Sequence, residues 1–476
     1  MDNGAMELTL ARMAKEFLPY SIDQRLLLPP DMRDWLPERH LARFVDDLVD
    51  QLDLSAIYAV YQSADDRGRR GYHPAMMVKL LVYAYCVGKP SSRKIERATY
   101  EEVAFRVLSG DQHPDHDCIA DFRKRHLKAL GALFTQVLVL CQKAGLVKLG
   151  HVAIDGTKRA ANASKHKAMS YGRMAEAESK LQQQVDRLLA EAERVDAQED
   201  AQYGKGKRGD ELPAELQRRE GRLKKIRAAM AELEAEAKAE AEHKAAEAKA
   251  KLQERAQHEA ETGKRVAGKP PAVPDVEQAK PDPKTQRNFT DPESRIMPDG
   301  ANKGSFMQGY NAQIAVDGEA QIIVAIDVVQ APNDKQQLSA MLQQVEQRVG
   351  LPAVTSADAG YYGEQVIEAL ERPSMELWVP PDRQMHGDPG LRGTLPARAS
   401  TTDWMRYKLR TTIAAALYRM RKAIVEPVFG QIKSVRGLRR FLLRGLANVQ
   451  DEFRLIAFTH NLLKLHRHRA AQALSR

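Results

Sequence analysis

The sequence lacks the features that would stabilise it covalently or anchor it in a membrane. Only three of its 476 residues are cysteine, an odd number with no CxxC pair, which excludes a disulfide framework and indicates a reducing compartment. It has no run of about 18 apolar residues, and it does not open with a basic-then-apolar signal layout. These absences predict a soluble, cytoplasmic protein with no membrane contact.

The sequence also lacks the ligand pattern of a zinc site and the pattern of a phosphate-binding loop. His113, His116 and Cys118 lie close together, but no second ligand pair accompanies them, which disfavours zinc. The turn GYYG at 360–363 is not followed by Lys-Ser or Lys-Thr, as a phosphate loop would be. Any metal or phosphate chemistry must therefore depend on other residues.

Positive charge exceeds negative charge only modestly, but the excess is concentrated near the C-terminus. The chain has 73 Lys and Arg residues against 64 Asp and Glu residues, a net charge of +9. Residues 401–476 contain 16 basic and 4 acidic residues, so the remainder of the chain is slightly negative. A local excess of this size predicts a polyanionic partner for the C-terminal segment.

Residues 1–147 are predicted to form an all-helical N-terminal domain. Apolar residues recur there at the spacing of packed helices, and short segments with Pro, Gly, Ser and Asp separate them. Within 91–126, a helix, a turn and a second helix bearing Arg123, Lys124 and Arg125 are compatible with a helix-turn-helix that contacts DNA. The same cations are equally compatible with the surface of an ordinary bundle, and the sequence favours neither interpretation.

Residues 166–290 differ from the rest of the chain in composition and are predicted to be an insertion. They are rich in Ala, Glu, Lys, Gln and Arg. A coiled-coil register is kept by the apolar residues Leu216, Leu223, Ile226, Met230, Leu233 and Ala237. Gly and Lys residues at 203–213 interrupt the pattern, which predicts an antiparallel helical hairpin. A Pro- and Lys-rich segment after Gly263 predicts a flexible linker back to the main domain.

The segments on either side of the insertion, 148–165 and 291–476, alternate between strand and helix patterns. An apolar run predicts a strand whose C-terminal end presents Asp155, and a second short strand ends at Asp358. Strands that alternate with helices predict a mixed α/β sheet, in which functional groups gather where the strands end. The sequence therefore predicts one catalytic core, divided by the insertion, with the two acids at its working edge.

A hairpin and a helix are predicted between these two acids. Two apolar-rich strands flank Asp317-Gly318, a strong signal for a tight turn. An amphipathic helix follows, and Asn333 or Asp334 is its expected N-terminal cap. Asp327 and Asp334 lie near the proposed sheet and are interpreted as capping or solvent-exposed acids.

A basic segment near the C-terminus contains a single acid, Glu426. At 3.6 residues per helical turn, Arg419, Lys422, Glu426 and Lys433 share one face. Alone, such a face predicts solvent-exposed salt bridges. Combined with two other acids in strand-like settings, it predicts a metal site beside phosphate, because Mg²⁺ prefers hard oxygen ligands.

These motifs, in this order, resemble the DDE transposases of bacterial insertion sequences. The similarity is greatest to members in which a ribonuclease H-like catalytic core follows an all-helical N-terminal domain. It rests on the segments AIDGTK, SADAGYYG and VEPVFGQIK, together with YHPAMMVKLLVYAYC, SSRKIERATYEEVAFRVL, DPESRIM and GYNAQIAVD. The resemblance implies an α/β fold with a ribonuclease H-like mixed sheet and an inserted helical hairpin. It implies that Asp155, Asp358 and Glu426 are the catalytic acids and metal ligands.

The resemblance also implies a reaction and its partners. Such a transposase cleaves DNA at the ends of its insertion sequence and transfers the 3′-OH ends into target DNA. Two Mg²⁺ ions, or Mn²⁺ in their place, are expected at the three acids. The expected partner is double-stranded DNA, both the terminal inverted repeats and the target, and the enzyme is expected to act on it as a homodimer. The helical domain is expected to bind the element ends.

The resemblance also implies that basic side chains lie beside the bound DNA. Families of this kind often carry Tyr and Arg seven and four residues before the Glu, and Lys seven residues after it. Lys433 fits the last position, while two pairs are candidates for the first two positions: Arg419 with Lys422, or Tyr418 with Arg421. The other cations expected along the DNA backbone are Arg436, Arg439, Arg440 and Arg444 near the C-terminus, and Arg123, Lys124 and Arg125 in the helical domain.

Two other functions would use the same features. A ribonuclease H-like nuclease or resolvase would need the same metal site but would cut DNA without joining it. A non-catalytic DNA-binding or scaffold protein would use the helical domain and the coiled coil, and would not depend on the three acids.

Overall fold

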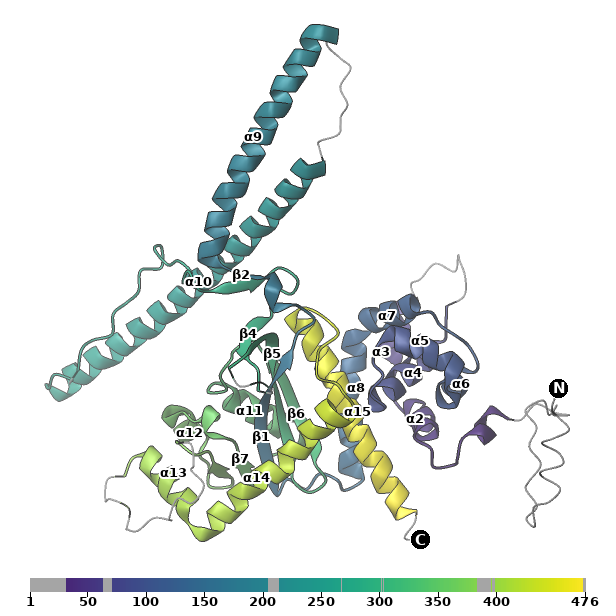
Figure 1. The fold of residues 1–476 in the computed structure, drawn as a ribbon. Helices are drawn as coiled ribbons and strands as arrows, with labels where there is room; N and C mark the ends of the chain where they lie inside the picture. The colour runs from purple at the N-terminus through teal and green to yellow at the C-terminus, as the bar shows by residue number, and fades with distance from the viewer. Residues whose placement is uncertain are drawn as a thin grey trace, which may run out of the picture.

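The structure is a computed structural model that describes residues 31–473 except 63–70, 204–213, 267, 301, 303, 383–394 and 396–398. Figure 1 shows three parts: a helical bundle near the N-terminus, a central sheet with helices around it, and a long helical arm. Residues 1–30 of the predicted helical domain and the predicted interruption at 204–213 lie outside the described residues. None of the described helices is long and apolar enough to cross a membrane.

The N-terminal bundle is all-helical, as the apolar spacing predicted. Its described residues form the short 3-10 turn η1 and seven α-helices: η1 Met32–Trp35, α2 Leu41–Val49, α3 Ser55–Gln62, α4 Pro74–Cys86, α5 Ser92–Glu101, α6 Val103–Ser109, α7 His116–Arg125 and α8 Leu127–Lys143. Almost every residue of α4 is buried, so this helix forms the centre of the bundle. Pro74 begins it at a position where no helical N–H is required.

The segment predicted as a helix-turn-helix contains three helices instead of two. Glu102 adopts an extended backbone, which ends α5 and allows α6 to begin in a new direction. Gly110 ends α6 in the left-handed region, with φ of 59°. Asp115 caps α7, since its carboxylate accepts a 2.7 Å hydrogen bond from the backbone N–H of Cys118. α7 packs against α5, so the segment retains a pair of packed helices, one before the turn and one after it.

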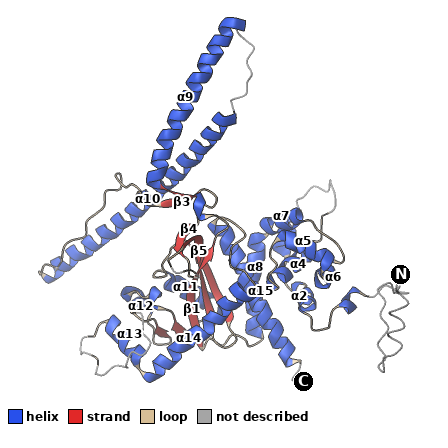
Figure 2. Cartoon of the chain, in the orientation of Figure 1, coloured by secondary structure: helices blue, strands red, loops and turns tan. Residues whose placement is uncertain are grey.

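A six-stranded mixed sheet forms the core of the second part (Figure 2). Its strands are β1 His151–Ala160, β4 Arg295–Pro298, β5 Phe306–Asp317, β6 Ile322–Val329, β7 Val354–Ser356 and β8 Glu376–Trp378. β5 pairs antiparallel with β1, β4 and β6, whereas β7 runs parallel to both β1 and β8. The fold class is as predicted: a ribonuclease H-like α/β core with a divided sequence and an all-helical domain before it.

The sheet corrects two local predictions. β1 does not end at Asp155 but continues to Ala160, because it pairs with β5 from Val152 onward through the polar residues. Asp155 therefore lies in the middle of a strand instead of at its C-terminal end. The predicted hairpin of β5 and β6 is present, but its turn spans residues 318–321 because β5 continues through Asp317, and the left-handed residue of the turn is Gln321, with φ of 58°.

Helices from the sequence after the arm cover the sheet. They are α11 Gln337–Val349, the short η3 Ala359–Tyr361, α12 Glu364–Leu370, α13 Thr401–Arg410, α14 Thr412–Gly430, the π-helical η4 Gln431–Val435 and α15 Leu446–Gln472. α11 packs against β5 and β6, while α14 packs against β1 (Figure 1). α13 was not predicted, and part of the segment before it lies outside the described residues.

One continuous apolar core joins the bundle to the sheet. α15 packs against β6 on one side and against α8 and α4 on the other. Its buried Phe453 and Phe458 belong to the same cluster as Phe134 of the bundle and Ile314 of the sheet. The helical domain and the core are therefore one packed body, and α15 is the element between them.

The arm is an antiparallel pair of helices, as predicted. α9 Tyr171–Tyr203 and α10 Ala214–Thr262 extend away from the sheet (Figure 1). Their contact buries a stripe that includes Leu181, Leu223 and Leu233. Two short strands, β2 Ala168–Ser170 and β3 Gln286–Asn288, pair antiparallel at its base. The side chain of Leu216, which was placed in the same stripe, lies outside the described residues.

The segment that follows α10, which was predicted to be a flexible linker, has contacts with the arm. The segment is irregular but lies against α10. The guanidinium of Arg255 donates to the carbonyl of Gly268 over 2.6 Å, and the backbone N–H of Val266 donates to Glu259 over 2.9 Å. Side chains of α10 thus form hydrogen bonds with the backbone of this Pro-rich segment, which has no regular secondary structure to supply them.

Candidate active site

Asp155 and Asp358 lie at neighbouring positions in the sheet. Asp155 is on β1, and Asp358 follows β7, the parallel neighbour of β1. Asp358 begins η3, where its carboxylate accepts a 2.9 Å hydrogen bond from the backbone N–H of Gly360. Because β1 and β7 are neighbouring parallel strands, the two carboxylates lie on the same part of the sheet.

Asp155 is held in a setting that disfavours negative charge unless a cation accompanies it. Burial and the nearby Asp358 raise its pKa to about 6, against the opposing effect of Arg421. The guanidinium Nη1 of Arg421 lies 2.9 Å from Asp155 Oδ2. A paired, largely buried carboxylate of this kind is common where function requires a perturbed acid.

Helix α14 brings Tyr418 and Arg421 to this acid. Arg421 is 7% exposed, and its guanidinium carbon is 5.8 Å from the centre of the Tyr418 ring. Arg419 and Lys422, the other candidate pair, are on the exposed face of the same helix. The structure therefore brings Tyr418 and Arg421 to the acid pair, although the strict spacing from Glu426 favoured the other two.

Pro427 helps to fix the position of α14 over the sheet. As a proline within the helix, it has no N–H to donate to the carbonyl of Ala423, four residues earlier. The side chain of Gln321, in the turn between β5 and β6, donates to that carbonyl over 3.0 Å instead. A hydrogen bond lost within the helix is thus replaced by one between the helix and the sheet.

Lys433 lies in the π-helical segment η4, directly after α14. Its ammonium donates to the hydroxyl of Thr157 and, over 3.3 Å, to the carbonyl of Lys158, both on β1. Burial, followed by repulsion from Arg159 and Arg439, lowers its pKa to about 8. Segments of π-helix are frequent at functional sites. This one directs Lys433 to the strand that carries Asp155.

Glu426 is not assembled with the two aspartates. Its side chain is exposed on α14, and among the residues that the structure describes no three His, Cys, Asp or Glu side chains are grouped closely enough to hold a metal ion. Asp155 and Asp358 supply oxygen donors and a concentrated negative charge, which suit a hard divalent cation. The pair therefore fits a metal ion, and Glu426 as its third ligand stays a prediction.

Asp334 is a fourth acid near this site, and the sequence assigned it to the wrong role. α11 begins after Gln336 and has no side-chain cap, so Asp334 does not cap it. Its carboxylate accepts hydrogen bonds from Asn311 and Gln313 of β5, over 2.6 and 2.7 Å, and lies 3.4 Å from the Lys158 ammonium. The signal that could have found it is the pair of amides in an otherwise apolar strand, since a buried amide needs a polar partner.

Two family models match separate parts of the chain. One is described as a transposase domain (DUF772) and matches residues 30–125, and the other is described as a transposase DDE domain and matches residues 278–462. The chain belongs to the DDE transposases of insertion sequences. These are enzymes that cleave DNA and transfer its strands, generally with divalent metal ions. Neither a curated protein nor a solved structure gave a significant match.

The matched ranges fit the division of the transposase core by the arm. The DDE domain match includes Asp358 and Glu426 but begins after the arm, whereas Asp155 lies before it. β1 nevertheless pairs with β5 and β7, so the arm separates Asp155 from the matched range in sequence only.

The other cations predicted to contact DNA divide into buried and exposed residues. Arg436 is 4% exposed and donates to Thr459 over 2.8 Å, and Arg123 is 6% exposed and donates to the carbonyl of Pro90 over 2.6 Å. Both guanidinium groups are thus used inside the transposase, which leaves them poorly placed to reach a phosphate. The exposed ones are Lys124, Arg125, Arg439, Arg440 and Arg444.

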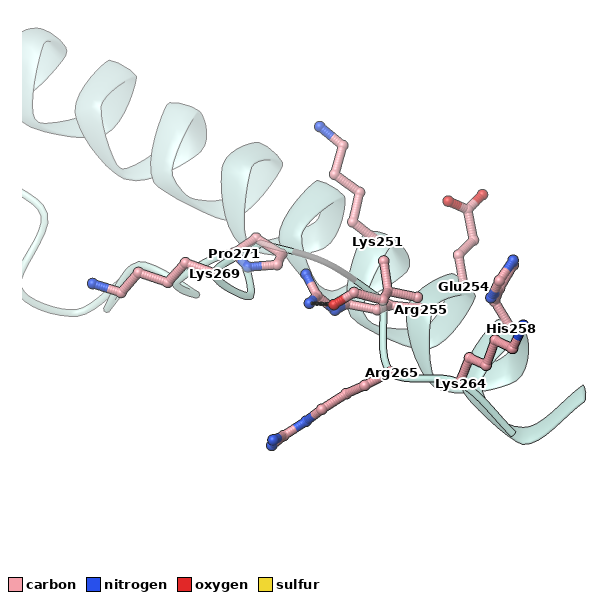
Figure 3. Close-up of a pocket in the computed structure, with 9 residues that line it drawn as sticks. Lys251, Glu254, Arg255, His258, Lys264, Arg265, Lys269 and Pro271 are labelled. Carbon is pink, nitrogen blue, oxygen red and sulfur yellow. Dashed lines mark hydrogen bonds between the residues drawn. The ribbon is translucent and has the colours of Figure 1, made fainter. Parts of the chain in front are cut away.

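A basic groove on the arm is separate from this site. It has a volume of about 710 Å³ and lies between the end of α10 and the segment after it. Figure 3 shows that Lys251, Lys269 and Arg265 extend in different directions instead of converging on one point. Arg255 is already bonded to its own loop. The groove therefore lacks the convergent groups of a catalytic pocket.

Proposed function

We propose that this transposase cleaves DNA at the ends of its insertion sequence and transfers the freed 3′-OH ends into target DNA, with Asp155, Asp358 and Glu426 as the metal-binding acids. The observation that supports this most directly is the pairing of β1 with β7. It brings together two acids that are 203 residues apart in the chain, beside the cations Arg421 and Lys433.

The proposed metal is Mg²⁺, with Mn²⁺ as an alternative, in a two-ion arrangement. Bound there, the ions would activate the attacking oxygen and neutralise the leaving oxygen of the phosphodiester. Arg421 keeps Asp155 ionised when no other cation is near, and so keeps the carboxylate ready as a ligand. The donors of Asp155 and Asp358 are carboxylate oxygens, which fit Mg²⁺ better than a soft metal.

The cations around the acids are proposed to hold the DNA. Lys433 is fixed beside β1 by Thr157 and is placed to balance a phosphate next to Asp155. The exposed Arg439 and Arg440 would follow the DNA backbone away from the acids. Exposed cations of α7, such as Arg125, would contact the element ends. The reaction involves both ends of the insertion sequence, which favours a homodimer bound to DNA.

The test uses purified full-length protein, a short DNA duplex with a pre-cleaved terminal repeat, and a supercoiled plasmid as target. Asp155→Ala, Asp358→Ala and Glu426→Ala should each abolish strand transfer while binding of the end duplex is retained. Asp382→Ala removes an exposed acid of the same core and should leave strand transfer unchanged.

The outcome distinguishes the three functions. If a parallel reaction with an uncleaved repeat shows cutting, but the pre-cleaved repeat is never joined to the plasmid, the enzyme is a nuclease without strand transfer. If all three variants retain full strand transfer, the acids are not catalytic and the proposal fails. If Glu426→Ala alone retains it, the third ligand must be sought elsewhere.

A further inference from the structure

Behind the two aspartates, a chain of buried polar side chains connects three elements of the core. We propose that Asp334 is a positioning residue for the catalytic pair, acting through Gln313 and Tyr361 on the short helix that begins at Asp358. This inference rests on the proposed function, because it assumes that Asp155 and Asp358 bind metal.

The first link is the carboxylate of Asp334 itself. Its Oδ1 accepts from the side-chain amides of both Asn311 and Gln313, and the Lys158 ammonium lies 3.4 Å away. Both amide residues are fully buried. A buried amide without a hydrogen-bond partner would lower stability by about 1–3 kcal/mol. The carboxylate of Asp334 therefore stabilises β5 by accepting from both amides.

The second link is the orientation of the Gln313 amide. Its NH₂ group is directed to Asp334, so its carbonyl oxygen must face the other way, where the hydroxyl of Tyr361 donates to it. The reversed amide would place one oxygen against the carboxylate and the NH₂ group against the Tyr361 hydroxyl. The acceptor oxygen of Asp334 therefore fixes the direction of the whole relay.

The third link joins Tyr361 to Asp358. Tyr361 is fully buried and is the last residue of η3, the 3-10 helix that Asp358 caps. The backbone N–H of Tyr361 donates to the carbonyl of Asp358 over 3.2 Å. A ring that is held at its hydroxyl and packed on all sides leaves Asp358, three residues earlier, little freedom to move.

Glycines next to both acids make room for this network. A Cβ at Gly156 would lie 2.5 Å from Gln313 Nε2 and 2.9 Å from Asp334 Oδ1, closer than any side chain can be. A Cβ at Gly360 would lie 3.0 Å from Asp358 Oδ1 and 3.6 Å from Asp334 Oδ2. Gly156, which follows Asp155, and Gly360, two residues after Asp358, both adjoin Asp334, so the positioning group lies against the backbone beside each acid.

The geometry favours positioning over direct metal binding by Asp334. Gly156 is paired with Gln313 across the strands, so the network lies on that face of β1, and Asp155 projects to the opposite face because side chains alternate along a strand. Asp334 also forms no metal-holding group with the aspartates among the described residues. Its effect must therefore pass through its neighbours.

The test measures Mn²⁺ binding to the full-length protein by calorimetry, in parallel with strand transfer and with binding of the end duplex. Loss of a residue that orients metal ligands typically lowers metal affinity by about 10–100-fold. We expect Asp334→Ala to lower Mn²⁺ affinity by at least about tenfold while end-duplex binding is unchanged. Asp334→Asn keeps an acceptor oxygen for Gln313, is the safer variant for folding, and should recover most of the loss.

Two further variants separate positioning from general destabilisation. Tyr361→Phe removes only the hydroxyl at the far end of the relay and should lower Mn²⁺ affinity as Asp334→Ala does. The double variant Asp334→Ala/Tyr361→Phe should then bind Mn²⁺ no more weakly than either single variant, because both substitutions break the same relay. Asp327→Asn is the matched control: this acid also accepts from a glutamine amide, that of Gln450 over 3.2 Å, but has no link to Tyr361. It should leave Mn²⁺ affinity within about twofold.

The inference is overturned if Asp334→Ala and Tyr361→Phe retain full Mn²⁺ affinity, if their effects add, or if Asp327→Asn causes an equal loss. Asp155→Ala, measured in the same series, distinguishes this failure from failure of the proposed function. If Asp155→Ala abolishes Mn²⁺ binding and strand transfer and the Asp334 variants change neither, only the positioning role is rejected. If Asp155→Ala changes neither, the proposed function itself fails.

Discussion

The two faces of α14 carry positive charge in different surroundings. On the face against the sheet, Arg421 is almost completely buried and is paired with Asp155. On the opposite face, Arg419 and Lys422 are exposed, as is Glu426. The buried cation has one fixed partner, whereas the exposed cations are free to meet a partner outside the chain.

This difference shows that a cation near an active site can serve the protein or the DNA, and that burial decides which. A buried guanidinium must balance a charge within the fold, since an unpaired one would be too costly to bury. An exposed cation loses little by remaining unpaired and is available to phosphate. The sheet face of α14 therefore balances the charge of Asp155, and the outer face, which also carries the predicted ligand Glu426, is the candidate contact for DNA.

The comparison is tested most strongly by removing Arg421. Arg421→Ala leaves the largely buried Asp155 without its cation, and we expect it to lower the free energy of unfolding by about 2–3 kcal/mol at pH 8, less than for a fully buried pair. The loss should be smaller at pH 5, where Asp155 can take up a proton instead. Urea denaturation at the two pH values measures both effects.

Lys422→Ala is the matched control for this prediction. It removes the adjacent cation on the exposed face and should change the free energy of unfolding by less than about 0.5 kcal/mol. If the two variants lose similar stability, the contrast between the faces of α14 does not hold. If Arg421→Ala loses the same amount at both pH values, Asp155 is not the group that it balances.

A second, smaller effect is expected from Lys433. Its pKa of about 8 lies below that of a lysine in the unfolded chain, so between pH 8 and about 10 the unfolded state binds more protons and stability rises with pH. After allowance for solvent screening, wild type should gain about 1–2 kcal/mol relative to Lys433→Met between pH 7 and pH 9.5. Lys422→Met should show no such gain. A wild-type protein that loses stability relative to Lys433→Met over this range would contradict the burial of a charged Lys433.

Much of the fold follows from local patterns in the sequence. The helical spacing, the coiled-coil register and the apolar strands each depend on neighbouring residues, so the bundle, the arm and the sheet could be predicted. The end of β1 could not, because the strand is extended by its pairing with β5, which lies on the other side of the arm. Helix α6 depends on a break at Glu102, a residue with no special turn chemistry.

The residue types of the site could be predicted from the sequence, but the contacts between these residues could not. Asp155 and Asp358 could be named because each follows a short apolar run. The choice between Arg421 and Lys422 could not be made from spacing, since the two are adjacent in the sequence and only the packing of α14 against β1 shows which of them meets Asp155. Asp334 was missed because its partners come from β5, and no local pattern links a loop acid to a strand amide.

The smallest effect on stability, and the most specific effect on DNA, is expected on the outer face of α14. The double variant Arg419→Ala/Lys422→Ala should fold as stably as wild type, to within about 0.5 kcal/mol for each substitution. If both cations contact phosphate, binding of the end duplex weakens and the slope of log affinity against log salt concentration becomes shallower by about 2, since each contact releases about one counterion.

The control for this experiment removes two exposed lysines of the arm, Lys225→Ala/Lys249→Ala, which changes the net charge by the same amount. A slope that changes only in the α14 variant assigns the effect to phosphate contact, because a change in overall charge would act in both variants. Equal slopes for the α14 variant and wild type would show that the exposed cations do not meet DNA. The contrast between the two faces would then concern stability alone, and Lys433, held beside β1, would remain a candidate contact for a phosphate next to Asp155.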